Sequence, residues 1–444
     1  MQSKKWGIVG GGIMGMTLAH RLAQQGHQVT IFEAAPEIGG LVSSWKMPTG
    51  SEKNKQEIEW DKFYHVILLS DFRTRSILKD IGLEDKIEWV ETKTGFYING
   101  KLYSMSDTIE FLKFPTLNLF DKFRLGLTII VASRIKNWKR LEKIPVTTWL
   151  KRWSGSNTYN KIWLPLLRAK LGESYTKTSA VFIWATIQRL YGARRSGLKK
   201  EMFGFVPGGY KVVIEAFKRT LLNESVHIRT STSVTEVKTG ADNKPLIKLT
   251  DDSVESFDEV IVTLPSPIAT RLCTGLSPLE KQQLNNIEYL GVICVAVLMD
   301  KPISEFYITN ITDARFPFTG IIEMTALVNK AYLDGHTLIY LPKYVSTDDP
   351  LFKQSDEEIR DYFISNFKNM YPLITDDNIK FAGVARANHV ITVAKLNYSE
   401  TLPGVQTSVP NVYIVNTSHI IDGTLNVNET VRVAETKLEE ILKQ

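Results

Sequence analysis

Residues 5–33 read KWGIVGGGIMGMTLAHRLAQQGHQVTIFE, and this stretch decides the fold. A short apolar run at Lys5–Val9 is followed by a glycine-rich turn and by apolar residues at helical spacing over Met14–Gln25. A second apolar run follows at Val29–Phe32, and Gly26 stands where a helix commonly ends in a left-handed cap. The pattern predicts a strand, a tight turn, a helix and a second strand, which together begin a Rossmann-like α/β domain.

The turn has the spacing GxGxxG, carried by Gly10, Gly12 and Gly15. The first glycine permits the tight turn, the second lets backbone approach a pyrophosphate, and the third allows the helix to pack closely on the strand. Glu33 follows the second strand, where a carboxylate accepts hydrogen bonds from a ribose 2′-hydroxyl and repels a 2′-phosphate. A glycine-rich turn without a ligand is the alternative for the motif alone. The flanking strand, helix and acid favour a dinucleotide site.

Four further segments lie in order along the chain: EAAPEIGG at 33–40, FVPGGY at 205–210, SVTEV at 233–237 and DEVIVTLP at 258–265. Together with the glycine motif, they resemble landmarks of the flavin amine oxidase and protoporphyrinogen oxidase superfamily. The resemblance implies FAD as the cofactor and a Rossmann-like FAD-binding domain of the GR2 type. It also implies that the loop with Gly39 and Gly40 contacts the pyrophosphate and that Val234 flanks the adenine.

The last landmark departs from the family. Where these proteins usually carry a Gly-Asp pair after the final strand, this chain has Val415-Asn416-Thr417. We expect the Asn416 amide to hydrogen-bond the ribityl or phosphate region without supplying a charge. Asn428 and Thr430 are expected to open the final helix, whose N–H groups would face the flavin O2 and stabilise negative charge on the reduced ring. Simple capping of that helix by Asn428 is a compatible interpretation.

Two other segments resemble UDP-galactopyranose mutase: DKFYH at 61–65 and GFYINGKLY at 95–103. A mutase of that kind uses reduced flavin as a nucleophile and not as a hydride acceptor. The resemblance therefore implies two different reaction types for one cofactor.

We expect an FAD-binding domain assembled from three separated pieces, 1–75, 201–275 and 380–444. Two insertions would form the rest of the molecule. Residues 76–200 are predicted to form a helical, basic subdomain, because helical spacing dominates between Phe72 and Lys200. Residues 276–379 are predicted to form an α+β subdomain that binds the substrate.

The net charge of +6 is unevenly distributed. Residues 121–200 contain eighteen Lys and Arg against three acids, so this stretch carries +15 and the rest of the chain −9. It also holds five of the nine tryptophans. Lys and Arg residues interleaved with tryptophan are typical of a protein surface that binds an anionic membrane. The alternative is a basic face that is merely exposed to solvent. Because no nucleic-acid module is recognisable, we expect no nucleic-acid partner despite the charge.

No apolar run reaches the ~20 residues that span a bilayer; the nearest, Leu125–Ser133, is bracketed by Arg124 and Arg134. Cys273 and Cys294 are far apart and outside any CxxC spacing, so neither a disulfide framework nor a metal site is predicted. We expect a cytoplasmic protein that binds peripherally to the cytoplasmic face of the membrane.

Catalytic candidates are few. His65 follows an aromatic pair in the sequence. In one interpretation it lies near the isoalloxazine ring, and in the alternative it is a structural histidine. Arg168 and Lys170 are candidates for binding an anionic substrate group or polarising the flavin, with solvated helix charges as the alternative. Four tyrosines stand where a cavity is expected and receive no role: Tyr289, Tyr340, Tyr344 and Tyr398.

The leading hypothesis is an FAD-dependent oxidoreductase that abstracts a hydride from a C–H bond of an anionic or lipid-linked substrate, in which the cofactor supplies the difficult chemistry. One alternative is a redox-neutral sugar mutase. Another is a non-catalytic, membrane-associated protein that retains the fold and FAD.

Overall fold

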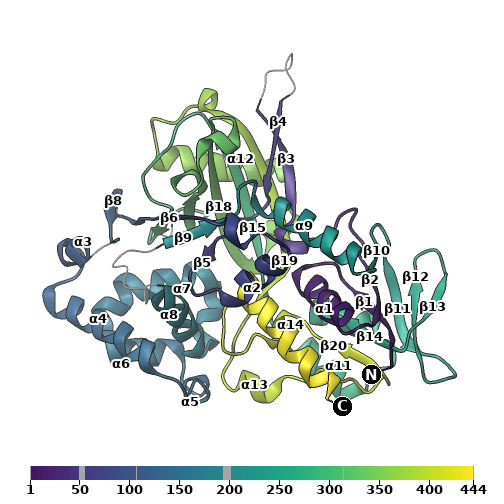
Figure 1. Ribbon diagram of the computed structural model, residues 1–444. Helices are drawn as coiled ribbons and strands as arrows, with labels where there is room; N and C mark the ends of the chain where they lie inside the picture. The colour runs from purple at the N-terminus through teal and green to yellow at the C-terminus, as the bar shows by residue number, and fades with distance from the viewer. Residues whose placement is uncertain (1, 50–55, 107, 194–201, 314, 444) are drawn as a thin grey trace.

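The computed structural model describes residues 2–49, 56–106, 108–193, 202–313 and 315–443. Its described part contains a parallel sheet near both chain ends, a larger mixed sheet, and a group of helices at one end of the molecule (Figure 1).

The parallel sheet has the order β10-β2-β1-β14-β20. Its strands are β10 (His227–Arg229), β2 (Gln28–Phe32), β1 (Lys5–Val9), β14 (Glu259–Val262) and β20 (Val412–Ile414). The central strands are almost continuously apolar and buried, as is typical of a parallel sheet covered on both faces. Since the strands come from three separated parts of the chain, the predicted Rossmann-like α/β fold built from discontinuous pieces is confirmed.

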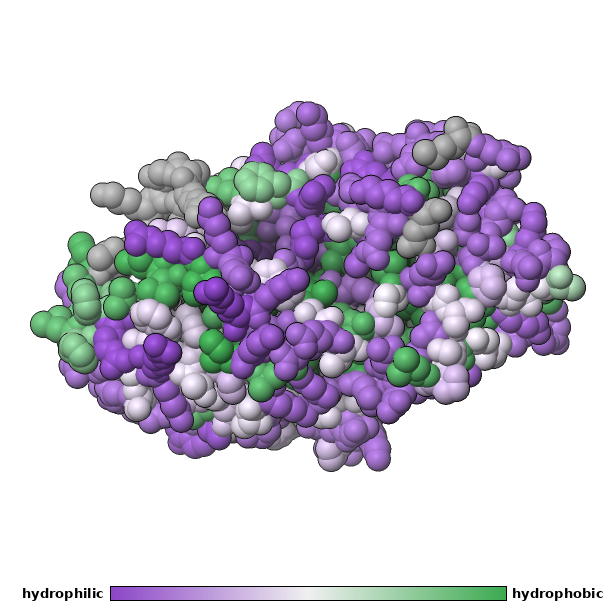
Figure 2. Space-filling model, turned by 90° about the horizontal axis from the view of Figure 1, so that it is seen from below, coloured by the Kyte–Doolittle hydropathy of each residue, from purple (hydrophilic) through white to green (hydrophobic). Residues whose placement is uncertain are grey.

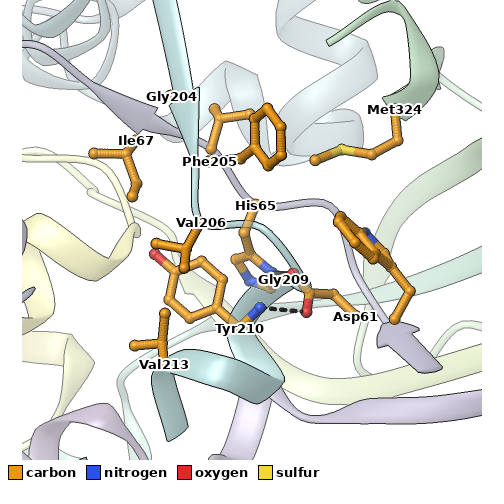
Figure 3. A pocket seen from close by; sticks show the side chains of 12 residues that line it. Asp61, His65, Ile67, Gly204, Phe205, Val206, Gly209, Tyr210, Val213 and Met324 are labelled. Atoms are coloured by element: carbon orange, nitrogen blue, oxygen red, sulfur yellow. Dashed lines mark hydrogen bonds and ion pairs between the residues drawn. The ribbon is translucent and has the colours of Figure 1, made fainter. Parts of the chain in front are cut away.

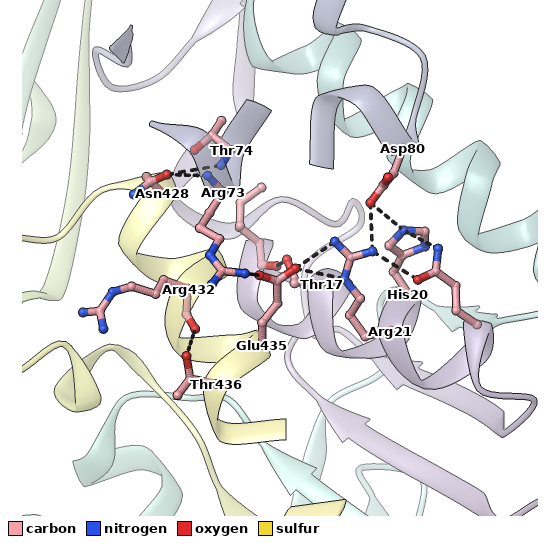
Figure 4. A network of polar contacts seen from close by, with 12 residues as sticks. Thr17, His20, Arg21, Arg73, Thr74, Asp80, Asn428, Arg432, Glu435 and Thr436 are labelled. Carbon is pink, nitrogen blue, oxygen red and sulfur yellow. Dashed lines mark hydrogen bonds and ion pairs between the residues drawn. The ribbon is translucent and has the colours of Figure 1, made fainter. Parts of the chain in front are cut away.

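Four helices pack around this sheet: α1 (Ile13–Gln24), α2 (Phe72–Asp80), α9 (Gly209–Asn223) and α14 (Val427–Leu442). The first and last of them, α1 and α14, lie side by side (Figure 1). Arg21 on α1 donates to Asp80 at 2.8 Å and to Glu435 on α14 at 2.7 Å, while Arg73 donates to Glu435 at 2.8 Å (Figure 4). These ion pairs fasten α2 to the parallel-sheet region.

The mixed sheet has the order β19-β15-β18-β17-β16-β7-β8. Its strands are β19 (Ile379–Thr392), β15 (Tyr289–Met299), β18 (Thr337–Ser346), β17 (Gly320–Glu323), β16 (Ile308–Ile311), β7 (Thr94–Ile98) and β8 (Lys101–Ser104). Strand β15 is buried along its whole length because one face packs on α12 (Asp356–Met370) and the other faces a second apolar cluster.

The sheet pairing differs from the predicted domain boundaries in two places. β19 lies in the predicted nucleotide piece 380–444 but pairs with β15 in the mixed sheet. β7 and β8 lie in the predicted helical segment 76–200 but extend the same sheet. The spacing of apolar residues does not predict which strands pair with one another, so only the long-range pairing assigns β19, β7 and β8 to the mixed sheet. The division of the chain into three functional domains otherwise stays a prediction.

The helical group is formed by α3 (Thr108–Lys113), α4 (Leu119–Arg134), α5 (Lys139–Glu142), α6 (Val146–Thr158), α7 (Leu164–Leu171) and α8 (Val181–Ala193). The helix predicted at Tyr159–Ala169 begins as a π-helical turn at Tyr159–Trp163 and continues as α7. Trp149, Trp163 and Trp184 are buried inside this group. The expectation that tryptophans of this stretch form an interfacial surface is therefore wrong for these three, which pack the helical core.

The remaining described elements are short. Two small sheets contain β3 (Ser44–Pro48) with β4 (Glu57–Asp61), and β11 (Val234–Thr239) with β12 (Pro245–Leu249) and β13 (Val254–Ser256). A third small sheet joins β5 (Ile67–Leu68), β9 (Met202–Phe205) and β6 (Glu88–Glu91). The remaining α-helices are α10 (Ser266–Leu272), α11 (Pro278–Asn285) and α13 (Tyr398–Thr401). Within the described ranges, no helix combines the length and apolar character needed to cross a bilayer.

Candidate active site

Two glycines of the turn between β1 and α1, Gly10 and Gly15, are held by contacts that leave no room for side chains. The Gly10 N–H donates to the Phe32 carbonyl at 2.8 Å, which fastens the turn to β2. Gly10 has φ +112°, a conformation that favours glycine. A Cβ on Gly15 would lie 2.0 Å from the Gly10 carbonyl oxygen. The close approach of helix to strand therefore requires glycine at both positions.

Gly12 has the opposite environment. It is the N-cap of α1, no side chain caps the helix there, and a Cβ on Gly12 would meet no atom of the chain within 4 Å. The loop with Gly39 and Gly40 lies alongside, because the Gly39 N–H donates to the Gly11 carbonyl at 2.9 Å. Uncapped helix N–H groups beside open space and a second glycine loop are what a bound diphosphate requires. These residues fit the predicted dinucleotide.

Glu33 stands directly after β2, as predicted. Its carboxylate accepts the Gly11 N–H at 2.7 Å and the Ala35 N–H at 2.8 Å, so it is fixed next to the glycine turn. The Thr232 N–H donates to the Glu33 carbonyl, which brings the start of β11, and with it Val234, to the end of β2. The segments predicted to contact ribose and adenine thus meet at one edge of the sheet, while their individual roles stay predictions.

Asn416 follows β20 and is buried. Its amide nitrogen donates to the Leu264 carbonyl at 2.8 Å and to Ser266 Oγ at 3.2 Å. Its amide oxygen accepts from the Ser418 N–H at 3.0 Å and from Ser418 Oγ at 2.6 Å. All the usual hydrogen bonds of the amide are made inside the chain, so this geometry does not support a direct contact with the cofactor. Asn416 ties the end of β20 to the loop after β14.

The final helix, predicted at Glu429–Leu442, begins two residues earlier, at Val427, and its cap is Asn426, which accepts the Glu429 N–H at 3.0 Å. Asn428 was expected to cap this helix, and that expectation is wrong. Its side-chain oxygen accepts the N–H of Arg73 at 2.9 Å and that of Thr74 at 3.3 Å, so it caps α2 across the interface (Figure 4). Thr430 lies in the first turn of α14 and is buried. Its hydroxyl donates a hydrogen bond to the Asn426 carbonyl.

A pocket lies between the parallel-sheet region and the mixed sheet (Figure 3). It is mainly apolar, and its lining residues include Trp60, Asp61, His65, Val66, Ile67, Phe205, Val206, Tyr210, Val213 and Met324. Asp61 is almost fully buried and accepts the Tyr210 N–H at 2.8 Å. Burial raises the pKa of the Asp61 carboxyl, and the neighbouring His65 and the Tyr210 N–H oppose that shift. His65 Nδ1 lies 3.8 Å from Asp61 Oδ2, beyond hydrogen-bond distance.

The structure separates the two predicted cations of α7. Arg168 is half exposed, 3.3 Å from the Glu173 carboxylate, and behaves as an ordinary helix charge. Lys170 points the other way: its Nζ lies 3.1 Å from the Tyr64 hydroxyl and 3.4 Å from the Tyr344 hydroxyl. The two hydroxyls are 2.9 Å apart. Lys170 thus joins the region next to His65 in three dimensions, and Arg168 does not.

Three of the four tyrosines without a predicted role have structural hydrogen bonds. Tyr340 donates to the Asp61 carbonyl at 2.6 Å, Tyr398 donates to the Ser418 carbonyl, and the Tyr289 hydroxyl contacts Ser266. Tyr344 alone reaches Lys170. Sequence reasoning missed Asp61, Tyr64 and Tyr210 as members of the site. The available signal was that Asp61 and Tyr64 stand beside His65 in one motif and that Tyr210 follows a glycine pair.

Among the described residues, no group of three or more His, Cys, Asp or Glu side chains is placed to hold a metal ion. Both cysteines, Cys273 and Cys294, are buried and unpaired. Burial raises the pKa of Cys273 to about 12, so its thiol stays protonated. The candidate site consists of the glycine cradle, the pocket around His65 and the lysine–tyrosine cluster.

Comparisons with known proteins agree with this architecture. A family model described as flavin containing amine oxidoreductase matches residues 13–413. Zeta-carotene desaturase of Synechocystis sp. is 23% identical over 431 residues, covering 85% of this chain and 85% of that protein. A putative protoporphyrinogen oxidase from Exiguobacterium sp. 255-15 superposes with a TM-score of 0.76 at 19% identity, covering 100% of both chains. Reduced UDP-galactopyranose mutase superposes with a TM-score of 0.74 at 15% identity, covering 99% of this chain and 96% of that one.

The two structural likenesses concern the fold, whereas the family model extends from the first residue of α1 to β20 of the parallel sheet. The resemblance inferred from the sequence is confirmed, and so is FAD as the cofactor. The chain belongs to the family of flavin-containing amine oxidoreductases and is an FAD-dependent oxidoreductase.

Proposed function

We propose that this enzyme oxidises a C–H bond of an anionic or lipid-linked substrate. The observation that carries the proposal is that one family match covers residues 13–413, from the start of α1 through Gly15 and the loop with Gly39 and Gly40 to the mixed sheet, so most of the cofactor site and the predicted substrate region belong to the same oxidoreductase architecture. The similarity to a protein named zeta-carotene desaturase supports removal of hydrogen from carbon. FAD, when bound, supplies the hydride acceptor, and oxygen or another acceptor then reoxidises it.

The chain's own residues hold the substrate and exclude water. The pocket beside His65 is lined by apolar groups such as Trp60, Phe205 and Met324, which favour a hydrocarbon part of the substrate. Asp61 keeps the loop after β4 in place through the Tyr210 N–H and the Tyr340 hydroxyl. Hydride removal leaves a cation on carbon, so a double bond forms only when a base, either water or a side chain of the site, takes a proton from the neighbouring carbon. We assign His65 to positioning, next to the buried Asp61.

We also propose that the protein binds peripherally to the cytoplasmic face of an anionic membrane. Seven large apolar side chains are exposed on two neighbouring helices: Ile109 and Leu112 on α3, and Leu119, Phe120, Phe123, Leu127 and Ile130 on α4. Hydrophobic groups gather at this end of the molecule (Figure 2). Apolar patches that are rimmed by cations commonly mark a membrane contact.

The basic segment 121–200 contributes less uniformly to this surface than expected. Arg189 pairs with Asp71 and Lys177 with Glu288, while Lys122 donates to a backbone carbonyl. Arg194, Arg195, Lys199 and Lys200 lie outside the described residues. The apolar face of α3 and α4 therefore supports the membrane proposal more directly than the charge alone.

Spectroscopy of the flavin tests the reaction. The purified holoenzyme is incubated anaerobically with candidate lipids and anionic substrates, and flavin absorbance is recorded. Bleaching by substrate alone supports the proposal. Turnover only after reduction with dithionite would contradict it and would favour a redox-neutral mutase, the alternative suggested by the motif at 61–65 and the mutase-like fold. Absence of both bleaching and turnover with the whole panel would favour a non-catalytic FAD-binding protein.

Liposome flotation tests the membrane proposal. Binding should require anionic lipid, weaken as salt rises, and fall when Phe120 and Phe123 are both replaced by serine. Equal binding of the wild type and this double variant would exclude α4 as the contact. Replacement of exposed Leu373, which lies outside this face in the loop before β19, serves as the control and should leave binding unchanged.

A further inference from the structure

The cluster of Lys170, Tyr64 and Tyr344 is assembled from three distant parts of the chain. Lys170 comes from α7, Tyr64 from the loop after β4, and Tyr344 from β18. The lysine Nζ contacts both hydroxyls, at 3.1 and 3.4 Å, and lies 4.5 Å from the centre of the Tyr344 ring. The Lys170 ammonium group is held in place by the two aromatic rings and is not a mobile surface charge.

The cluster contains more hydrogen-bond donors than its internal hydrogen bonds use. An ammonium group has three N–H donors and each tyrosine has one O–H donor. The three contacts inside the cluster use three of these five donors. Burial raises the pKa of Tyr64 well above its usual range, so its hydroxyl stays protonated. Within the described part of the chain, the hydrogen-bond partners of Lys170 are these two hydroxyls, and neither supplies a negative charge.

The cluster packs in the same apolar region as two residues that adjoin the predicted cofactor-binding loops. Tyr64 is the neighbour of His65 in the sequence. Tyr64 and Tyr344 pack in the same apolar cluster as Leu41, which follows Gly40, and Leu425, which precedes the cap of α14. The two tyrosines therefore share one apolar cluster with residues next to Gly40 and to the cap of α14.

We propose that Lys170, Tyr64 and Tyr344 bind an oxyanion of the substrate, a carboxylate or a phosphate, and so fix the position of the C–H bond relative to the flavin. One Lys170 N–H and one tyrosine O–H would donate to the anion, which would pair with the partly buried lysine charge. This inference rests on the proposed function in that it takes the bound anion to be part of the substrate. Lys170 is a positioning residue in this arrangement and takes no part in breaking the bond.

Binding to the oxidised holoenzyme tests the inference without turnover, so its outcome does not depend on hydride transfer. Octanoate and octyl phosphate are titrated against the wild type, with 1-octanol as the neutral probe, and flavin absorbance reports binding. We expect both anions to bind more tightly than octanol, and the tighter of the two identifies the head group. Loss of a charge-assisted hydrogen bond should weaken anion binding at least about tenfold in Lys170→Met. Lys170→Arg should keep most of the affinity.

Arg168→Met is the matched control, because it removes the same charge from the same helix at an exposed position and should bind both anions as the wild type does. Three results would overturn the inference. The wild type binds neither anion better than octanol, Lys170→Met binds them as tightly as the wild type, or Lys170→Met changes the flavin midpoint potential but not anion affinity. If Lys170→Met does not retain FAD, Tyr344→Phe replaces it: several-fold weaker anion binding supports the inference, and unchanged binding overturns it.

Discussion

The two walls of the candidate active site are built from different material. The cofactor wall is mostly backbone, formed by Gly10, Gly12 and Gly15 in one turn and by Gly39 and Gly40 in a loop beside it. The substrate wall consists of side chains, and its two tyrosines are 280 residues apart in the chain. A backbone cradle requires only the absence of side chains at fixed spacing, so it is encoded locally. A side-chain cluster requires the whole fold to bring its members together.

The largest effect that this comparison predicts is at Gly15. The Cβ of an alanine there would lie 2.0 Å from the Gly10 carbonyl oxygen. Because this oxygen belongs to the backbone, it cannot rotate away as the end of a side chain could. We expect Gly15→Ala to lose about 3 kcal/mol or more of folding free energy and to be purified without FAD. Thermal unfolding and the ratio of flavin to protein absorbance measure both effects. A variant with wild-type stability and full flavin would contradict the role given to this contact.

Gly12→Ala separates the cofactor from the fold. Because a Cβ at this position meets no atom of the chain, we expect the variant to fold with nearly unchanged unfolding temperature. The methyl group would occupy the space through which the pyrophosphate approaches, and FAD affinity should fall at least about tenfold. Titration of the apoprotein with FAD gives the affinity. Gly126→Ala in α4, also in open space, is the control and should bind FAD normally. Unchanged affinity in Gly12→Ala would remove this residue from the cofactor wall.

The mixed sheet, which carries Tyr344 of the substrate wall, should lose stability as the pH rises from about 4.5 to about 7. Glu323 on β17 is buried, and burial raises its pKa to about 7 in the folded state. Since the unfolded carboxyl titrates near 4.5, the stabilising contribution is complete below that pH and is lost as pH rises through about 7. The loss is on the order of 3 kcal/mol. Glu323→Gln should remove this pH dependence, because an amide oxygen can still accept from Ser304. Parallel stability curves for both proteins between pH 5 and 8 would show that the carboxylate is not responsible.

The region after β20 of the parallel sheet should respond in the opposite direction. Burial lowers the pKa of His419, beside Asn416, to about 4. Its stabilising contribution is complete above the unfolded value of about 6.5 and is lost as pH falls from there through about 4, by an amount on the order of 3 kcal/mol. His419→Gln should therefore lose less stability than the wild type between pH 7 and pH 4.5, measured by chemical unfolding with FAD in excess. An identical loss in both proteins would assign the acid sensitivity to other groups.

The smallest expected effect is at Asn428. Since its side chain caps α2 from a neighbouring helix, Asn428→Ala should lower the free energy of unfolding by about 1 kcal/mol. FAD affinity should stay within twofold of the wild type, because the side-chain oxygen is already used by Arg73 and Thr74. A large fall in FAD affinity without a loss of stability would restore Asn428 to the cofactor wall. Asn426→Ala, which uncaps α14 itself, provides the comparison.

Much of the cofactor wall was predictable because its signals are contiguous. The strand, turn and helix follow one another within residues 5–33, and Glu33 stands at the end of the second strand as expected. Predictions failed where a side chain has a partner far along the chain. Asn428 was expected at its own helix and caps α2 instead, and Asn416 makes its hydrogen bonds with the loop after β14. Spacing gives no information on such partners.

On the substrate wall, the sequence offered Arg168 and Lys170 as equal candidates, two positions apart on one helix. Two residues correspond to about 200° of rotation on an α-helix, so one side chain faces solvent when the other faces the interior. Only the packing of α7 against β18 decides which is which. Tyr64 and Tyr344 could not be selected from the sequence either, because they meet Lys170 only through contacts between distant segments.

The sequence by itself determined the nucleotide fold, the cofactor and the family, because a glycine spacing and an acid are requirements of the backbone and of a known ligand. The tertiary structure alone decided which charge enters the site, which amides are already used, and that an apolar face of α3 and α4 stays exposed. These are properties of contacts between distant segments, and they exist only when the chain is folded.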